Sequence, residues 1–247
     1  MNPVEIIVIT EGATEREVGR VLCRRGILSN RGRPQPPDWR STIGSRDGYD
    51  QVIQALGGSN PLGSASRALL IFDQENSPDP QQRVQQIQND LIQRDGSGFW
   101  QGISFQPVPG FGNLFEHRDS TGRHFVLHIS QGYSGTIPIG NQDFDGYILQ
   151  LLQGPFRQAI VSGLLGGSPG VSPDALLQKA EIEITQLMSR NGYPWTHAKS
   201  WLYAYITVFQ FRQSHVWFAG RAVEVAPEQE LRRVFASLIE AWDRLCR

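Results

Sequence analysis

The chain has 247 residues and a formal net charge of -1 at pH 7. This length allows one large domain or two small ones, and the near-neutral charge excludes a nucleic-acid-binding surface that is basic over the whole molecule. The two cysteines lack the spacing of a disulfide framework or a zinc site, and no apolar run is long enough to span a membrane, so we expect a cytoplasmic protein without membrane association.

The N-terminal region begins with a strand and a helix. Residues 4–10 (VEIIVIT) form an apolar run rich in β-branched residues, which is typical of a strand buried in a parallel sheet. A glycine turn follows, and the pattern then predicts a helix over 14–25 with Thr14 as its N-cap. Residues 29–48 are rich in Pro, Gly and Arg and predict a loop, within which 39–43 is a candidate strand.

The next segments repeat this alternation. Residues 49–56 have helical periodicity, 57–66 form a flexible connection, and 68–72 (ALLIF) predict a second buried strand. Pro80 opens a polar helix that extends to about residue 94. This βαβα order predicts an α/β fold in which a mostly parallel sheet is flanked by helices.

The rest of the chain changes character. Alternating runs over 103–138 predict strands or a hairpin that extend the sheet, and residues 144–165 carry apolar residues at helical spacing. After a linker at 163–173, amphipathic helices are predicted over 173–190 and 227–246.

These patterns suggest two parts, a core over 1–140 and a helical, aromatic part over 141–247 packed on it as a mixed α/β C-terminal extension. Many aromatic residues of the second part can form a base-stacking platform, although their helical spacing favours a core or a partner interface. They are Trp195, Trp201, Tyr203, Tyr205, Phe209, Phe211, Trp217 and Phe218.

Two acidic motifs carry the chemistry. Glu11 and Glu15 (EGATE) follow the first predicted strand, and Asp73 and Glu75 (DQE) follow the second. Loops at the carboxyl ends of parallel strands meet at one edge of the sheet, so neighbouring strands would bring these carboxylates together. A bound cation would offset the mutual repulsion of these carboxylates, and oxygen ligands favour Mg²⁺ or Mn²⁺. The sequence therefore predicts a metal site for phosphodiester chemistry.

A Glu-Gly after the first strand, followed by an acidic triplet after a later apolar strand, resembles the Toprim domain. The EGATE form is most similar to nucleases of the overcoming-lysogenization-defect group and to small stand-alone Toprim-like proteins. The resemblance implies a Rossmann-like core in which Glu11, Asp73 and Glu75 hold one metal ion and Glu15 helps to hold a second. Glu75 stands where the family pattern has aspartate.

The same resemblance extends to two later positions. Nuclease-like relatives have a further acidic metal ligand at the start of a later helix, a place that fits Asp145, with Asp143 as the substitute. They also have a lysine near the site, for which Lys199 is the best source in this chain. A lysine there would stabilise charge developing on phosphate. Glu11, Asp73 and Lys199 are thus the expected catalytic residues.

The resulting hypothesis is a Mg²⁺- or Mn²⁺-dependent Toprim nuclease that acts on DNA or RNA, in defence or in nucleic-acid processing. No GxxxxGK[ST] motif is present, so an ATP-driven step would need a partner ATPase. The alternative is a catalytically degenerate Toprim scaffold that binds a partner protein or a second copy of itself as a regulatory subunit.

Overall fold

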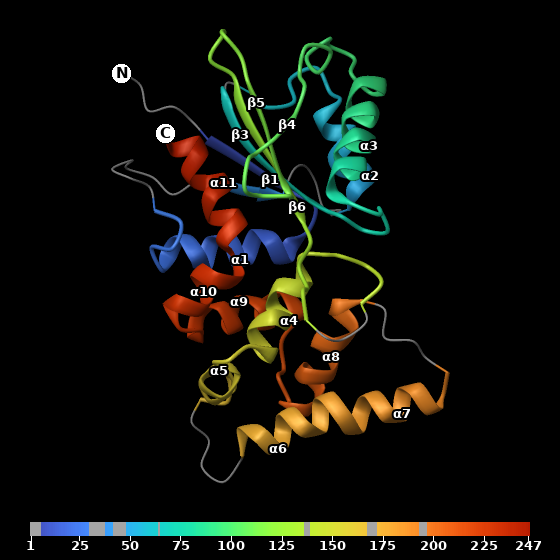
Figure 1. Cartoon of the computed structure of the whole chain (residues 1–247), viewed down its shortest axis with the longest axis vertical. Helices are drawn as coiled ribbons and strands as arrows, with labels where there is room; N and C mark the ends of the chain where they lie inside the picture. Colours follow the sequence, from blue (N-terminus) through green and yellow to red (C-terminus); the bar gives the residue numbers. More distant parts are fainter. Residues whose placement is uncertain are drawn as a thin grey trace. The chain divides into compact units, whose positions relative to one another are not determined.

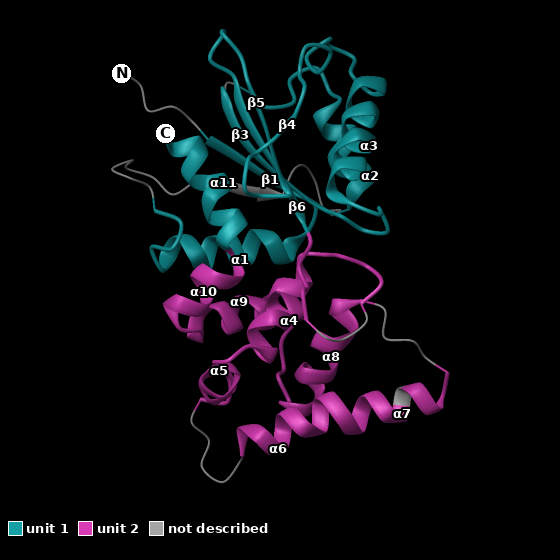
Figure 2. Ribbon diagram, viewed as in Figure 1, with its two compact units in different colours: residues 1–130, 236–247 teal, residues 131–235 magenta. Residues whose placement is uncertain are grey.

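The computed structural model describes residues 6–29, 38–41, 48–63, 65–135, 139–166, 172–192 and 197–247. Two compact units make up the chain (Figure 2). The first unit contains Met1–Ser130 and Ala236–Arg247, and the second contains Gln131–Phe235. This division differs from a single boundary near residue 140, because the last helix of the chain belongs to the first unit.

The first unit is built on a six-stranded sheet in the order β2-β1-β3-β6-β5-β4 (Figure 1). The strands are β1 (Ile6–Thr10), β2 (Asp38–Ser41), β3 (Arg67–Asp73), β4 (Gln106–Pro107), β5 (Leu114–Arg118) and β6 (His124–Ser130). Pairing is parallel from β2 through β1 and β3 to β6, and antiparallel between β6 and β5 and between β5 and β4. The predicted α/β fold is confirmed, with a mixed sheet.

Helices cover both faces of this sheet (Figure 1). They are α1 (Ala13–Arg24), α2 (Tyr49–Leu56), α3 (Pro80–Gln93) and α11 (Ala236–Cys246). Leu70 and Phe72 of β3 share a core with Ile53 of α2 and Ile87 of α3. The alternate side chains of the strand point to the opposite face, where α11 contacts β3 and β6 and α1 contacts β1. Both faces of the central strands are therefore buried, as their apolar sequences predicted.

The helix predicted over 227–246 is two helices, α10 (Glu228–Val234) and α11. The chain leaves helical geometry at Phe235, where φ is -99° and ψ is 22°. In the first unit, Leu238 and Trp242 of α11 are buried, and the Trp242 indole donates to the Ser29 carbonyl at 2.9 Å. Burial of this apolar face explains why α11 belongs to the unit that contains the sheet.

The second unit is helical in the residues described, with one isolated β-bridge between Asn141 and His197, so the predicted mixed α/β extension is corrected. Its helices are α4 (Asp145–Gln153), α5 (Arg157–Leu164), α6 (Pro173–Gln178), the π-helical segment η1 (Lys179–Ile184), α7 (Thr185–Arg190), α8 (Ala198–Val208), α9 (His215–Val225) and α10. The pattern over 144–165 is thus interrupted after Gln153, where Gly154 adopts an extended conformation.

The aromatic residues of the second unit are mainly core residues. Four of them are buried, namely Trp201, Tyr205, Phe209 and Phe218. Tyr203 and Trp217 are exposed, whereas Trp195 lies outside the described residues. A stacking platform made from the whole group is therefore ruled out, since buried rings cannot receive bases.

Candidate metal centre

Three carboxylates meet at one edge of the sheet in the first unit. Glu11 directly follows β1, Asp73 is the last residue of β3, and Glu75 lies two residues further on. Because β1 and β3 are parallel neighbours, their carboxyl ends lie side by side. One oxygen from each of the three side chains lies within 4.8 Å of the others. The order of strands thus brings both acidic motifs into one cluster.

The backbone around the cluster orients these side chains. The Asp73 amide donates to Glu11 Oε2 at 3.1 Å, which links the two motifs directly. Glu75 adopts a positive φ of 56° in the turn that the Ser77 amide closes by donating to the Gln74 carbonyl. This left-handed conformation is uncommon for a residue with a side chain and is found preferentially at functional sites.

A buried arginine accompanies the carboxylates. Arg83 of α3 is 4% exposed, and its Nη2 atom lies 3.7 Å from Glu11 Oε2. Its Nε donates to the Asp73 carbonyl at 2.9 Å, and its guanidinium lies 4.2 Å from the centre of the Tyr49 ring. Arg83 therefore supplies a fixed positive charge beside the cluster and helps to hold both acidic motifs in place.

Sequence reasoning missed Arg83 and Tyr49, although Arg83 carried a signal. It lies in the first turn and a half of α3, after the N-cap Asp79 and Pro80. The helix dipole disfavours a cation there unless a negative charge faces it. The N-cap Asp79 also supplies a negative charge four residues before Arg83, so this signal does not single out Glu11.

Glu11 has a strongly perturbed acidity. The pKa of Glu11 is raised from its ordinary value of 4.5 to about 7, chiefly by burial, with a smaller contribution from the charge of Glu75. The hydrogen bond from the Asp73 amide and the charge of Arg83 act in the opposite direction. Near neutral pH Glu11 therefore exchanges a proton readily, and a bound cation would favour its ionised form.

Glu15 is buried but does not belong to the cluster of three. The N-cap of α1 is Gly12, which corrects the prediction of Thr14, and Glu15 is the third residue of the helix. A Cβ atom on Gly12 would lie 2.7 Å from Glu15 Oε2, so this carboxylate folds back over the start of α1. That is where the glutamate of a capping box lies, which offers a structural role for Glu15. Its part in holding a second metal ion stays a prediction.

Asp145 and Lys199 lie in the second unit, where the structure brings them together. The Lys199 ammonium is 3.7 Å from the carboxylate of Asp145, which is 5% exposed. Asp143 accepts a hydrogen bond from the Gly146 amide at 3.1 Å, the contact of a residue that caps the start of α4. The charges of Asp145 and Lys199 also act on His215, whose pKa is lowered chiefly by burial.

The donor set of the cluster fits a hard divalent cation. All three side chains offer carboxylate oxygens, which Mg²⁺ and Mn²⁺ prefer. Opposite ligands of an octahedral Mg²⁺ lie about 4.2 Å apart, and the three carboxylate oxygens lie within 4.8 Å of one another. Small movements of flexible side chains would bring Glu11, Asp73 and Glu75 around one ion.

Comparisons of the chain with models of known protein families, with curated proteins and with solved structures found no significant match. Within the part of the chain that the structure describes, no helix combines the length and apolar character required to cross a membrane.

Proposed function

We propose that this protein is a divalent-metal-dependent nuclease in which Glu11, Asp73 and Glu75 hold the metal ion. The observation that carries this proposal is the convergence of the three carboxylates after two neighbouring parallel strands. The Toprim-like order of the two acidic motifs supports the choice of phosphodiester bonds as the substrate. Water is the nucleophile in this reaction.

The residues divide the work between binding and orientation. Asp73 and Glu75 offer half-buried carboxylates, and Glu11 offers a buried one that the Asp73 amide orients. A bound divalent cation supplies Lewis acidity that stabilises negative charge on a phosphate oxygen and makes water more acidic. Arg83 keeps Glu11 turned toward the cluster before the cation arrives.

Cleavage of labelled single- and double-stranded DNA and RNA, with Mg²⁺ or Mn²⁺, tests the proposal. We expect Glu11→Gln and Asp73→Asn to lower the rate by about a hundredfold or more, because each removes a ligand charge without changing side-chain size. Glu17→Gln is the matched control, since Glu17 lies on the same helix as Glu15 and outside the cluster. Equal cleavage by wild type and all three variants would refute the proposal.

The Arg83–Glu11 contact favours a second candidate, the degenerate scaffold. An arginine beside Glu11 already neutralises part of the charge that a metal ion would neutralise. A scaffold of this kind would cleave none of the four substrates, and Glu11→Gln would leave its partner binding or self-association unchanged. Analytical ultracentrifugation of wild type and Glu11→Gln measures self-association directly.

A further inference from the structure

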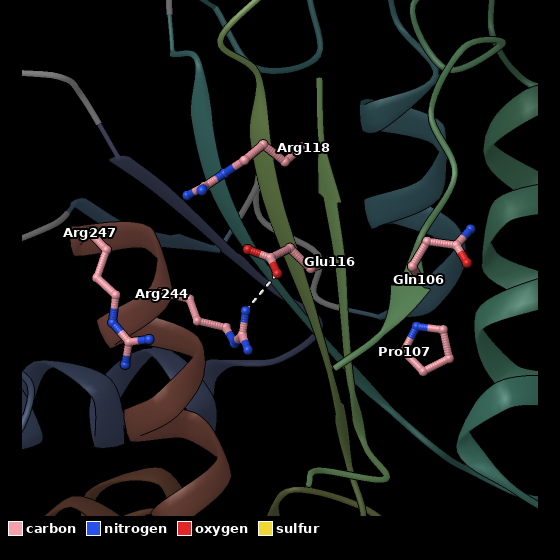
Figure 3. A pocket seen from close by; sticks show the side chains of 6 residues that line it. All are labelled: Gln106, Pro107, Glu116, Arg118, Arg244 and Arg247. Atoms are coloured by element: carbon pink, nitrogen blue, oxygen red, sulfur yellow. Dashed lines mark hydrogen bonds and ion pairs between the residues drawn. The ribbon is translucent and has the colours of Figure 1, made fainter. Parts of the chain in front are cut away.

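A second polar site lies in the first unit, between β5, β4 and the end of α11 (Figure 3). It is a cavity of about 290 Å³. The residues that line it are Gln106, Pro107, Glu116, Arg118, Arg244 and Arg247. Three of these six are arginines, although the net charge of the whole protein is -1.

Glutamates neutralise only part of this positive charge. Arg244 Nη1 lies 2.6 Å from Glu116 Oε2, and Arg244 Nε lies 3.1 Å from Glu240 Oε1. Glu240 also pairs with the exposed Arg247 at 3.5 Å. Glu116 and Glu240 therefore pair with Arg244 and Arg247, and neither of them pairs with Arg118.

Arg118 is the third arginine of the lining. It extends from β5 toward the side of α11 (Figure 3), and it makes no ion pair with a carboxylate among the described residues. Its Nη2 atom lies 3.1 Å from Nδ1 of His124, which is 2% exposed. An arginine can only donate, so Nδ1 of His124 accepts and carries no proton.

The buried imidazole connects the guanidinium groups. His124 must then carry its proton on Nε2, which donates to Glu116 Oε1 at 2.6 Å, and Glu116 in turn accepts from Arg244. Burial lowers the pKa of His124; the hydrogen bond with Glu116 opposes this and the charge of Arg118 adds to it, and the lowered pKa is consistent with a neutral ring. The chain from Arg118 through His124 and Glu116 to Arg244 fixes two guanidinium groups on opposite sides of the cavity.

We propose that this cavity binds the phosphate group of a small phosphorylated molecule, with Arg118, Arg244 and Arg247 as the groups that contact the anion. The paired N–H donors of a guanidinium group match the oxygens of a phosphate in geometry and in charge. Guanidinium groups that are already held in place lose little conformational entropy when they bind. The cavity lies just below the usual range of about 300 to 1,000 Å³ for small-molecule sites. An extended groove, which a duplex would need, is not what these residues form.

The site is separate from the carboxylate cluster. Arg118 of β5 pairs with His124 of β6, and His124 in turn pairs with Arg67, the first residue of β3. Asp73 is the last residue of β3. The two sites therefore lie at opposite ends of β3, roughly 20 Å apart along a strand of this length. A ligand in the cavity would act as an effector or a second substrate, and its binding does not depend on metal.

Calorimetric titration with inorganic phosphate, pyrophosphate and a nucleoside monophosphate, in the presence of EDTA, tests this proposal. We expect saturable binding by the wild type and at least a tenfold weaker affinity for Arg118→Gln. Arg118 is exposed, so its replacement should leave the fold intact, which thermal unfolding checks. Arg232→Gln is the control, because it removes the same charge from an exposed position on α10 and should bind like the wild type.

Three results would overturn the proposal. The first is no saturable binding of any of the three probes up to about 10 mM. The second is equal affinity in wild type and Arg118→Gln. The third is that the wild type binds a nucleic-acid oligonucleotide but none of the small anions, and that Arg118→Gln no longer binds the oligonucleotide. This result would assign the arginines to binding of a nucleic-acid backbone. Because EDTA removes divalent ions, none of these results depends on nuclease activity.

Discussion

Replacing Glu11 by glutamine should stabilise the metal-free protein at neutral and alkaline pH. The substitution keeps the size of the side chain and an oxygen that can accept from the Asp73 amide. It removes the negative charge whose burial raises the pKa of Glu11 to about 7. A variant that gains stability while losing a function is the behaviour expected of a strained binding site.

The magnitude follows from the pKa of Glu11 in the two states. In the unfolded chain the pKa has its ordinary value of 4.5, and in the folded protein it is about 7. Between these values the folded protein binds more protons than the unfolded chain, so its stability falls as the pH rises and levels off above about pH 7. A difference of about 2.5 in pKa corresponds to about 3 kcal/mol. Glu11→Gln should avoid this loss.

Thermal unfolding of wild type, Glu11→Gln and Glu17→Gln in EDTA measures the effect. At about pH 8 we expect Glu11→Gln to melt roughly 5 to 10 °C above the wild type, with the gap closing toward pH 4.5. Mn²⁺ at a fixed concentration should raise the melting temperature of the wild type more than that of Glu11→Gln. A gap that does not change with pH would refute the assignment of the titration to Glu11.

Three further predictions concern Arg83, His128 and Lys199. Arg83→Met should lower the free energy of unfolding by about 3 kcal/mol at pH 8, because Glu11 loses its counter-charge. The loss should be smaller at pH 5, where Glu11 is protonated. Urea unfolding at both pH values measures the difference. Burial lowers the pKa of His128 from 6.5 to about 3. The stability of the wild type relative to His128→Gln should therefore fall by roughly 1.4 kcal/mol per pH unit as the pH falls below 6.5, which urea unfolding of both proteins measures. Lys199→Met should lower the free energy of unfolding by about 1 kcal/mol, since the lysine is half exposed. If the ion pair with Asp145 is structural, the variant should cleave nucleic acid at the same rate as the wild type. Unchanged stability would contradict that pairing.

Much of the sheet and its acidic edge could be predicted because the evidence is local. The runs that became β1 and β3 are apolar enough to identify buried strands, and Glu11 and Asp73 follow them directly. Pro80 at the start of α3, after the capping residue Asp79, is an equally local signal. The rule that parallel strands present their carboxyl ends at one edge then brings Glu11 and Asp73 together.

Other features depend on contacts between distant parts of the chain. The sequence does not show that α11 packs beside β6, so it could not show that Arg244 reaches Glu116 and helps to form a cavity with Arg118. Arg83 was missed because its role depends on the approach of α3 to Glu11. Glu15 had the right spacing for a ligand, but the same spacing suits a carboxylate that folds back over a helix start.

The most direct test of the metal centre is a titration of the protein with Mn²⁺, followed by electron paramagnetic resonance of the free ion, for wild type, Glu11→Gln, Asp73→Asn and Glu17→Gln. We predict a saturable site in wild type and Glu17→Gln that is weakened at least tenfold, by about 1.4 kcal/mol or more, in the other two variants. Equal binding by all four proteins, or no binding by the wild type, would contradict the assignment of Glu11, Asp73 and Glu75 as a metal site.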